Sequence, residues 1–307
     1  MPTSKNAGPS STSSRAGLRA GCMNLWIEAA RPRTLPAAVA PVLVGTATAQ
    51  RFLPLRFAGA LVVALAVQVG VNYANDYFDG TKGVDSEHRT GPRRAVAAGL
   101  VAPSAMRRAA AAAFGVAAIA GLALALVAGM GLLIVGALCF LAALGYSGGP
   151  RPYASAGLGE LFVFVFFGLV ATTGSAYVQI EEVVSAAATA AIPIGLLATA
   201  ILVANNLRDL HTDANAGKIT LAVRLGAART ATLYRALIFG AFPFLVLLAG
   251  LTESAWPLLA FAGLPLTLPL YRGVASEEPS ALVRVLAGTA RLELAFGVLL
   301  AVGLWIA

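Results

Sequence analysis

Long apolar stretches, one after another, dominate this sequence and limit what it can fold into. A bilayer with a hydrocarbon core of about 30 Å needs about 20 apolar residues per helix. Charged residues make up only 12% of the chain, about half of their share in a soluble domain. The sequence therefore predicts an all-α polytopic membrane protein. About nine transmembrane helices are expected, at 35–50, 57–79, 104–128, 131–146, 158–180, 186–209, 228–249, 254–271 and 284–306.

The charges between these stretches predict an orientation. If the N-terminus is cytoplasmic, the loops on that side receive most of the Arg and Lys residues. The opposite side receives Arg51, Arg56, Glu181, Glu182 and Glu253. This asymmetry is what the positive-inside rule expects, and it favours a cytoplasmic N-terminus and an external C-terminus. It also explains the net charge of +8 without nucleic acid as a partner.

The first residues have a different composition from the rest of the chain. Residues 1–24 are rich in Ser, Ala and Gly, contain several basic residues, and have no apolar core of a signal peptide. A segment of this composition cannot bury enough apolar surface to fold. We expect a disordered basic tail at 1–24 and a single transmembrane domain at 25–307.

Two acidic clusters lie at the ends of two apolar stretches. The chain has only 14 acidic residues, and five of them are the aspartates of these clusters. A carboxylate inside a membrane costs roughly 2.5–3.5 kcal/mol on insertion scales, so a cation or substrate is expected to compensate them. The clusters are Asn72–Asp79, continuing to Asp85, and Asn205–Asp209, continuing to Asp213.

Both clusters fall on the same side of the membrane. The second and sixth predicted helices run inward, so each cluster lies at a cytoplasmic helix end. The even offset between them suggests two parallel repeats about an axis along the membrane normal. Residues three or four apart share a helix face, which gives one polar stripe per helix. The stripes are Asn72, Asn75, Asp76 and Asp79, and Asn205, Asp209 and Asp213.

The donor atoms of these stripes are oxygens, which favour a hard cation over zinc or copper. Mg²⁺ usually takes one or two carboxylates and bridges to substrate phosphates. Two separated carboxylate groups therefore suggest two Mg²⁺ ions with a polyanion between them. Neighbouring bases support a diphosphate: Lys82, Arg89, Arg93, Arg94, Arg208 and Lys218. The alternative is that such bases only fix topology, which we favour for Arg107, Arg108, Arg224 and Arg229.

These residues resemble the UbiA superfamily of intramembrane prenyltransferases. That family has two Asp-rich motifs at the inner ends of its second and sixth helices. The matching residues here are Asn75-Asp76-x-x-Asp79 with Asp85, and Asp209-x-x-x-Asp213. The resemblance covers nearly the whole chain after residue 25, and it implies a UbiA-like helical bundle.

Further motifs resemble the 1,4-dihydroxy-2-naphthoate branch of that superfamily, which serves menaquinone synthesis. Asp85 follows Asp79 by six residues, whereas the 4-hydroxybenzoate branch has a spacing of four. The other matching segments are Ala30–Pro36, Asn72–Tyr77, Gly91–Arg94, Gly149–Tyr153, Gly157–Glu160 and Gly217–Val223.

The resemblance implies a polyprenyl diphosphate donor, a dihydroxynaphthoate acceptor and loss of CO₂ and diphosphate. It places the enzyme in the bacterial inner membrane, with its active site at the cytoplasmic face. Asp76, Asp79, Asp209 and Asp213 would bind Mg²⁺, with Asp85 as a further ligand or base. The remaining roles fall on Asn72, Asn75, Asn205, Arg93, Arg208 and Lys218 around the diphosphate, and on Arg33 and Arg151 for the acceptor carboxylate.

Tyr146, at the end of the fourth predicted helix, has two interpretations. It would stabilise the carbocation or position the acceptor, or it is an interfacial tyrosine of the aromatic belt. Two alternatives for the whole chain also stay open. One is a prenyltransferase that acts on another aromatic acceptor, such as 4-hydroxybenzoate or homogentisate. The other is a secondary transporter, which predicts acids near the bilayer midplane rather than at helix ends.

Overall fold

The computed structural model describes residues 25–83, 94–150, 152–276 and 278–307, and all regular elements among them are helical. The predicted all-α architecture is confirmed for these residues, while the tail predicted at 1–24 lies outside them. In chain order the elements are η1 (Pro32–Thr34), α2 (Pro36–Thr48), α3 (Pro54–Thr81), α4 (Pro103–Ala128), α5 (Leu132–Ser147), η2 (Tyr153–Ala156), α6 (Gly159–Val163), η3 (Phe164–Val170), α7 (Ala171–Ile180), α8 (Ser185–Arg208), α9 (Leu210–Asn215), α10 (Leu221–Gly240), α11 (Pro243–Leu251), η4 (Trp256–Leu266), α12 (Thr267–Gly273) and α13 (Pro279–Ile306).

Helical segments account for each predicted membrane stretch, and a turn at 241–242 divides the stretch 228–249 into α10 and α11. Six segments are long and apolar enough to cross a membrane: Pro54–Thr81, Pro103–Ala128, Gly159–Ile180, Ser185–Arg208, Leu221–Leu251 and Pro279–Ile306. The apolar helices α2 and α5 are shorter, with 13 and 16 residues. At 1.5 Å per residue, α2 reaches only about 20 Å. The protein is an integral membrane protein, while nine crossings and the orientation of the termini remain predictions.

Proline marks the start of five of these helices. Its missing N–H would have no partner in the first turn, and its fixed φ suits a helix. The backbone therefore enters a helix at each of these positions without losing a hydrogen bond. The residues are Pro36, Pro54, Pro103, Pro243 and Pro279.

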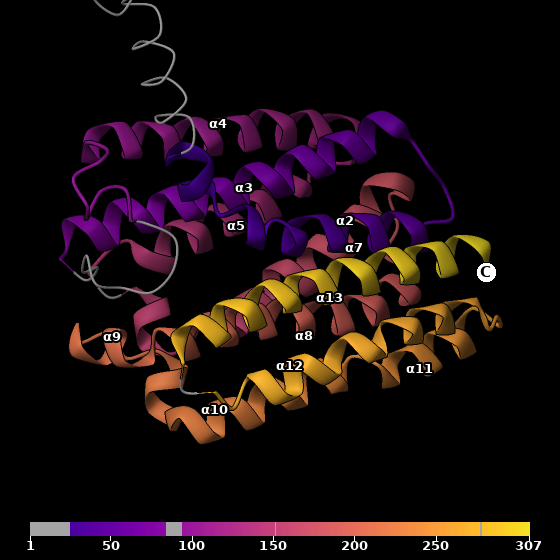
Figure 1. Ribbon diagram of the computed structural model, residues 1–307. Helices are drawn as coiled ribbons and strands as arrows, with labels where there is room; N and C mark the ends of the chain where they lie inside the picture. Colours follow the sequence, from indigo (N-terminus) through magenta and orange to yellow (C-terminus); the bar gives the residue numbers. More distant parts are fainter. Residues whose placement is uncertain (1–24, 84–93, 151, 277) are drawn as a thin grey trace, which may run out of the picture.

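The helices pack around α8 and α13. Figure 1 shows α3 and α4 side by side along one flank, α10 to α12 along the other, and α13 between them. α8 is the most buried of the long helices, and its interior residues are small or aliphatic, including Ala190, Ile194 and Leu197. This central position places the C-terminal end of α8, with the second acidic cluster, inside the bundle.

Glycines let some helices approach more closely than any side chain would allow. A Cβ at Gly45 of α2 would overlap the carbonyl oxygen of Thr172 in α7. A Cβ at Gly168 of η3 would lie 2.5 Å from the Cα of Gly195 in α8. Small residues at helix contacts are typical of membrane proteins, where backbone proximity supplies the packing energy.

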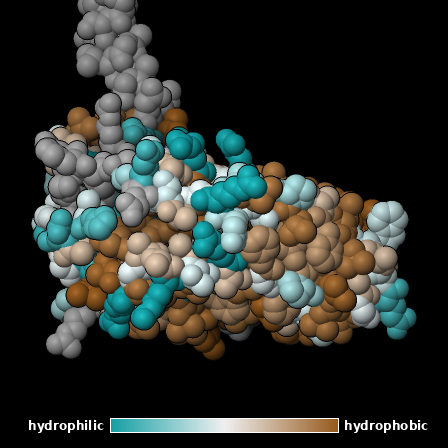
Figure 2. Space-filling view, turned by 60° about the horizontal axis from the view of Figure 1, so that its bottom comes forward, coloured by the Kyte–Doolittle hydropathy of each residue, from teal (hydrophilic) through white to brown (hydrophobic). Residues whose placement is uncertain are grey.

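Large apolar side chains cover much of the outer surface. Leu55 is 89% exposed, Ile119 73% and Ile134 69%. Figure 2 shows an extensive hydrophobic surface, with hydrophilic side chains gathered mainly toward one end. In water, molecules with such an exposed apolar surface would aggregate, whereas lipid solvates the surface. The distribution fits a bundle that faces hydrocarbon along its sides.

Candidate active site

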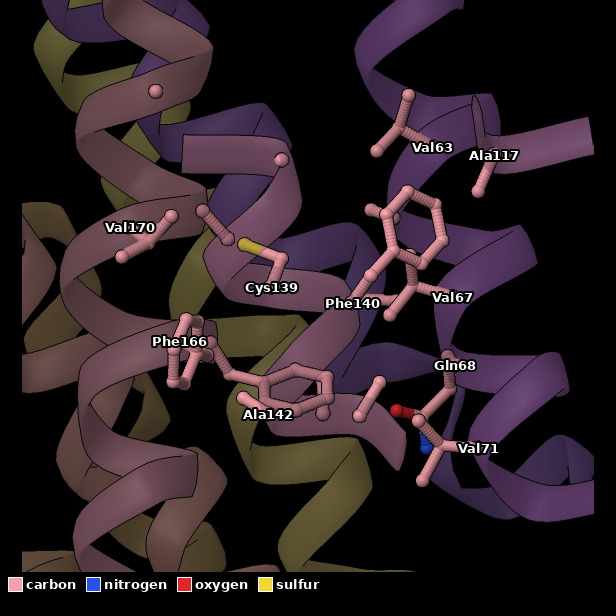
Figure 3. A pocket seen from close by; sticks show the side chains of 18 of the residues that line it. Val63, Val67, Gln68, Val71, Ala117, Cys139, Phe140, Ala142, Phe166 and Val170 are labelled. Carbon is pink, nitrogen blue, oxygen red and sulfur yellow. The ribbon is translucent and has the colours of Figure 1, made fainter. Parts of the chain in front are cut away.

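A cavity of about 540 Å³ lies between α2, α3, α4, α5, α7 and α8. Its walls are mainly apolar: Val63 and Val67 of α3 lie opposite Phe166 and Val170 of η3, and α5 contributes Cys139 (Figure 3). The polar lining residues come from η1 and its N-terminal flank, from the C-terminal parts of α3, α5 and α8, from η2 and from α7. They are Arg31, Thr34, Gln68, Asn72, Asn75, Tyr146, Tyr153, Ser175 and Asn205.

The π-helix η3 keeps one wall of this cavity in register. The residues Phe162, Phe166, Val170, Gly174 and Val178, each four apart, all line the cavity. In an α-helix of 3.6 residues per turn, residues four apart drift around the axis. A π-helix bonds i to i+5 and has a wider turn, which offsets that drift. The segment thus turns a single face to the cavity over its whole length.

A row of aromatic side chains lies along that wall and begins at the polar end of the cavity. Tyr146 packs edge-on against Tyr153, with ring centroids 5.5 Å apart, and Tyr153 stacks on Phe162 at 3.9 Å. The Tyr153 hydroxyl donates to the Ala142 carbonyl at 2.8 Å, and burial raises the pKa of this phenol above its ordinary value. Tyr153 is therefore a neutral structural donor at physiological pH. Tyr146 interacts electrostatically with Asp79 of α3.

The first acidic cluster anchors the chain that follows it. The Asp76 carboxylate is buried and accepts the backbone N–H groups of Ala95 and Val96 at 3.0 and 3.2 Å. These bonds hold the segment after the undescribed residues 84–93 against the end of α3. These two bonds use about half of the acceptor positions of a carboxylate.

An ion pair joins the two clusters. Lys218 Nζ lies 3.5 Å from Oδ2 of Asp79, and both side chains are almost buried. Lys218 follows α9, and its backbone N–H donates to the Asp213 carbonyl at 2.8 Å. The contact brings the loop of the second cluster onto the end of α3, so one site contains residues that are far apart in sequence.

In the second cluster, Arg208 binds its neighbour Asp209 through two contacts. Nε donates to Oδ1 at 2.8 Å and Nη2 to Oδ2 at 2.6 Å. The same guanidinium also donates to Oδ1 of Asn205 at 2.9 Å. Asp209 and Asp213 are both buried. A buried carboxylate requires such compensation, and here the chain itself supplies it for Asp209.

The asparagines of α3 hold neighbouring segments in place. Asn72 donates to the Ala30 carbonyl at 2.8 Å and to the Thr34 hydroxyl at 3.3 Å. Asn75 accepts from the Ser147 hydroxyl at the end of α5. The polar stripe predicted on α3 thus faces the bundle interior, where it contacts η1 and α5.

A model of the UbiA prenyltransferase family matches residues 38–306. The chain belongs to the UbiA prenyltransferase family. The family predicted from the two motifs is thereby confirmed. Two 1,4-dihydroxy-2-naphthoate octaprenyltransferases are similar to this UbiA chain. The Mycobacterium leprae protein is 43% identical over 82% of this chain and 85% of its own length. The Escherichia coli protein is 38% identical over 92% and 95%.

The fold of this UbiA protein also matches solved structures. A UbiA homologue from Archaeoglobus fulgidus, solved bound to GPP and Mg²⁺, aligns with a TM-score of 0.62 over 92% of this chain and all of that one. The two sequences are 15% identical, so this comparison establishes the fold alone. It confirms the expected UbiA-like bundle.

The carboxylate oxygens of the two clusters are ligands of the chemical type that Mg²⁺ prefers, but they lie in two separate places. Among the described residues, no three acids or histidines converge on one point. Mg²⁺ needs only one or two carboxylates when water and substrate phosphates complete its shell. Asp76 and Asp79 of this UbiA chain supply one such pair of oxygen donors, and Asp209 and Asp213 the other. The residues therefore fit the ion.

The structure does not place four of the predicted residues in the site: three of them are not described by the structure, and one lies at the surface. Asp85, Arg93 and Arg151 lie outside the described residues. Arg33 is exposed and does not line the cavity. Arg31 lines it instead, although the sequence pattern predicted no role for this residue in the site. Arg31 lies in the segment Ala30–Pro36, which resembles the naphthoate branch, but the spacing of the two arginines in that segment did not show which one turns inward.

Glu160 is a second residue for which the sequence pattern predicted no role. This side chain is buried at the start of α6, and Oε1 accepts from the Asn206 amide at 2.9 Å. Asn206 neighbours the cavity residue Asn205, so the pair fixes the end of α8 against α6. Both residues stand in segments already noted for other reasons, and only their contact in space links them.

We expect Glu160→Ala to destabilise the protein, because it leaves the Asn206 amide buried without an acceptor. Such a loss costs about 1–3 kcal/mol. The double variant Glu160→Ala/Asn206→Ala removes both polar groups and should recover part of that loss. Thermal unfolding in detergent of the single and double variants measures the coupling. Additive losses would show that the hydrogen bond contributes nothing.

Proposed function

We propose that this UbiA protein transfers a polyprenyl group from its diphosphate to 1,4-dihydroxy-2-naphthoate, releasing CO₂ and diphosphate. The product would be a demethylmenaquinol, a precursor of menaquinone. One observation carries the proposal: the Lys218–Asp79 pair unites both aspartate clusters beside the polar residues of a mainly apolar cavity. The choice of acceptor is supported by the two relatives described above, both of which are named for this naphthoate.

The aspartates would hold the donor's head group through metal. Asp76 and Asp79 form one ligand pair, and Asp209 and Asp213 the other, with two Mg²⁺ ions in total. Bound Mg²⁺ neutralises the charge that develops on the departing diphosphate. Asp85 and Arg93 stay predictions for the same head group.

Other residues of the chain would bind the diphosphate and stabilise the allylic carbon. Lys218 and Arg208 would donate to phosphate oxygens, a charge-assisted contact that strengthens as the leaving group gains charge. Asn75 and Asn205 would orient the head group from the cavity wall, while Asn72 holds η1 in place. The ring of Tyr146 would face the allylic carbon, where a π-face stabilises positive charge.

The net reaction exchanges the ring carboxylate for a prenyl group. The allylic C–O bond breaks, and its electron pair leaves with diphosphate. The electron-rich ring forms the new C–C bond to the allylic carbon. The carboxylate leaves as CO₂, and the electrons of its bond to the ring stay with the ring. No oxidant or reductant is required.

We place this site at the cytoplasmic face of the bacterial inner membrane. The charge asymmetry of the loops supports a cytoplasmic N-terminus. With that orientation, both clusters lie at inner helix ends, where water-soluble naphthoate and diphosphate exchange with the cytosol. The donor's tail and the product would remain in the apolar part of the protein and the lipid.

The acceptor can be tested directly. Purified protein is incubated with Mg²⁺, radiolabelled polyprenyl diphosphate and one aromatic acid at a time: dihydroxynaphthoate, 4-hydroxybenzoate or homogentisate. We expect labelled lipid product with dihydroxynaphthoate and none without Mg²⁺. Product from another acid but not from dihydroxynaphthoate would assign the chain to a different acceptor. No product with any acid would favour the transporter alternative.

A further inference from the structure

Arg31 stands apart from the other residues of the cavity wall. Among the described residues that line the cavity, it alone is charged. Its guanidinium interacts electrostatically with Asp76 of α3 and with Tyr146 of α5, and one of its terminal nitrogens is buried. A cation in this place offers a binding partner to an anionic group that enters the cavity.

The backbone at Arg31 is fixed in an unusual conformation. Its φ of 53° and ψ of 68° lie in the left-handed region, which is rare for a residue other than glycine. The Thr34 hydroxyl donates to the Arg31 carbonyl at 3.0 Å and accepts from Gln68 at 2.9 Å. Asn72 holds the preceding carbonyl, of Ala30. Such strain persists only where surrounding contacts enforce it, and it often accompanies function.

The other arginine and lysine of the site lie away from the cavity wall. Arg208 is bound to Asp209 and Lys218 to Asp79, and neither residue lines the cavity. Both therefore lie with the aspartate clusters, where a diphosphate is expected. Arg31 lies on the wall beside Asn72 and Tyr146, where a planar aromatic acid can enter.

We propose that Arg31 binds the carboxylate of the aromatic acceptor, an inference that rests on the proposed function. A carboxylate that enters an apolar cavity requires a paired cation. An arginine whose backbone is already fixed meets this need with two parallel hydrogen bonds at little entropic cost. Arg31 thus takes the place for which the sequence suggested Arg33 or Arg151.

This assignment also accounts for product release. The acceptor enters with a negative charge that Arg31 binds. When the ring loses CO₂, the product no longer has that charge, and its contact with Arg31 ends. The product is then an apolar quinol beside an apolar wall that leads away from the polar residues. Arg31 therefore distinguishes the acceptor from the product by charge alone.

Binding measurements on the full-length protein test the proposal. The probes are dihydroxynaphthoate and its methyl ester, which has the same ring but no charge. We expect the wild type to bind the acid at least about 10-fold more tightly than the ester. Arg31→Gln should bind both alike, and Arg31→Lys should keep part of the preference. In turnover, Arg31→Gln should raise the acceptor KM by about 10- to 100-fold and leave the donor KM unchanged.

Two further variants complete the design. Arg107→Gln, at an exposed arginine of α4, controls for the loss of a positive charge. Arg33→Gln tests the neighbouring candidate and should keep the preference for the acid. The assignment would be overturned if Arg31→Gln still bound the acid more tightly than the ester. It would also be overturned if Arg31→Gln raised the donor KM as much as the acceptor KM. If Arg31→Gln does not fold, an Arg31→Lys variant that prefers the acid as strongly as the wild type would also overturn the assignment. Wild type that makes no product but prefers the acid would contradict only the proposed function.

Discussion

Asp79→Asn is expected to lower kcat by about 100- to 1000-fold, the range seen when one electrostatic contact to developing charge is lost. Asp79 is buried and lies 3.5 Å from Lys218. The substitution keeps the shape of the side chain but removes a proposed metal ligand. It also leaves the Lys218 ammonium without its carboxylate. Turnover of the purified variant at saturating donor and acceptor measures the effect.

The same pair provides an internal test of coupling. Lys218→Met should also lose most activity, and Asp79→Asn/Lys218→Met should be little worse than either single variant, because residues that act as a unit are not additive. Glu182→Gln, which changes an exposed carboxylate after α7, should stay within about 2-fold of wild type. An Asp79→Asn variant with nearly full turnover would exclude Asp79 from the catalytic site.

Gly45→Ala is expected to destabilise the bundle by about 1–3 kcal/mol, the usual cost of overpacking. The new Cβ would overlap the Thr172 carbonyl and lie 2.9 Å from Cβ of Ser175. Backbone cannot yield as a flexible side chain does, so α2 and α7 must separate. Val42 and Ser175 line the cavity from these two helices, so activity should fall as well. Thermal unfolding in detergent, followed by circular dichroism, measures the change.

Gly115 of α4 is the matched control for this substitution. A Cβ there would meet no atom within 4 Å from neighbouring helices, among the residues that the structure describes. Gly115→Ala should therefore raise stability by up to about 1 kcal/mol through helix propensity. Equal effects of the two alanines would show that the α2–α7 contact does not depend on the missing side chain.

Hydropathy and spacing were enough to predict the helices and the polar stripe of α3. The second predicted stripe is divided, because α8 ends at Arg208 and Asp213 lies in α9. Each apolar stretch must be helical in lipid, because backbone groups have no other partner there. The stripe Asn72, Asn75 and Asp79 follows from helical periodicity and does face the interior. The family followed from the resemblance of the two motifs to those of UbiA proteins, which the match over residues 38–306 confirms.

Other features depend on contacts that sequence spacing does not encode. Arg31 and Arg33 are two residues apart, and the left-handed backbone at Arg31 decides which one reaches the cavity. That backbone depends on bonds from Gln68 and Asn72. The π-helix at Phe164–Val170 leaves no apolar pattern distinct from an α-helix. The contact of Lys218 with Asp79 likewise requires the folded chain.

The most direct measurement uses dihydroxynaphthoate labelled with ¹⁴C in its carboxylate. Purified protein, Mg²⁺ and a polyprenyl diphosphate are added, and released ¹⁴CO₂, diphosphate and prenylated lipid are counted together. We expect all three to appear in equal amounts and at equal rates, and none of them when the polyprenyl diphosphate is omitted. Prenylated lipid that retains the label, or diphosphate released without prenylated lipid, would contradict decarboxylating prenyl transfer at this site.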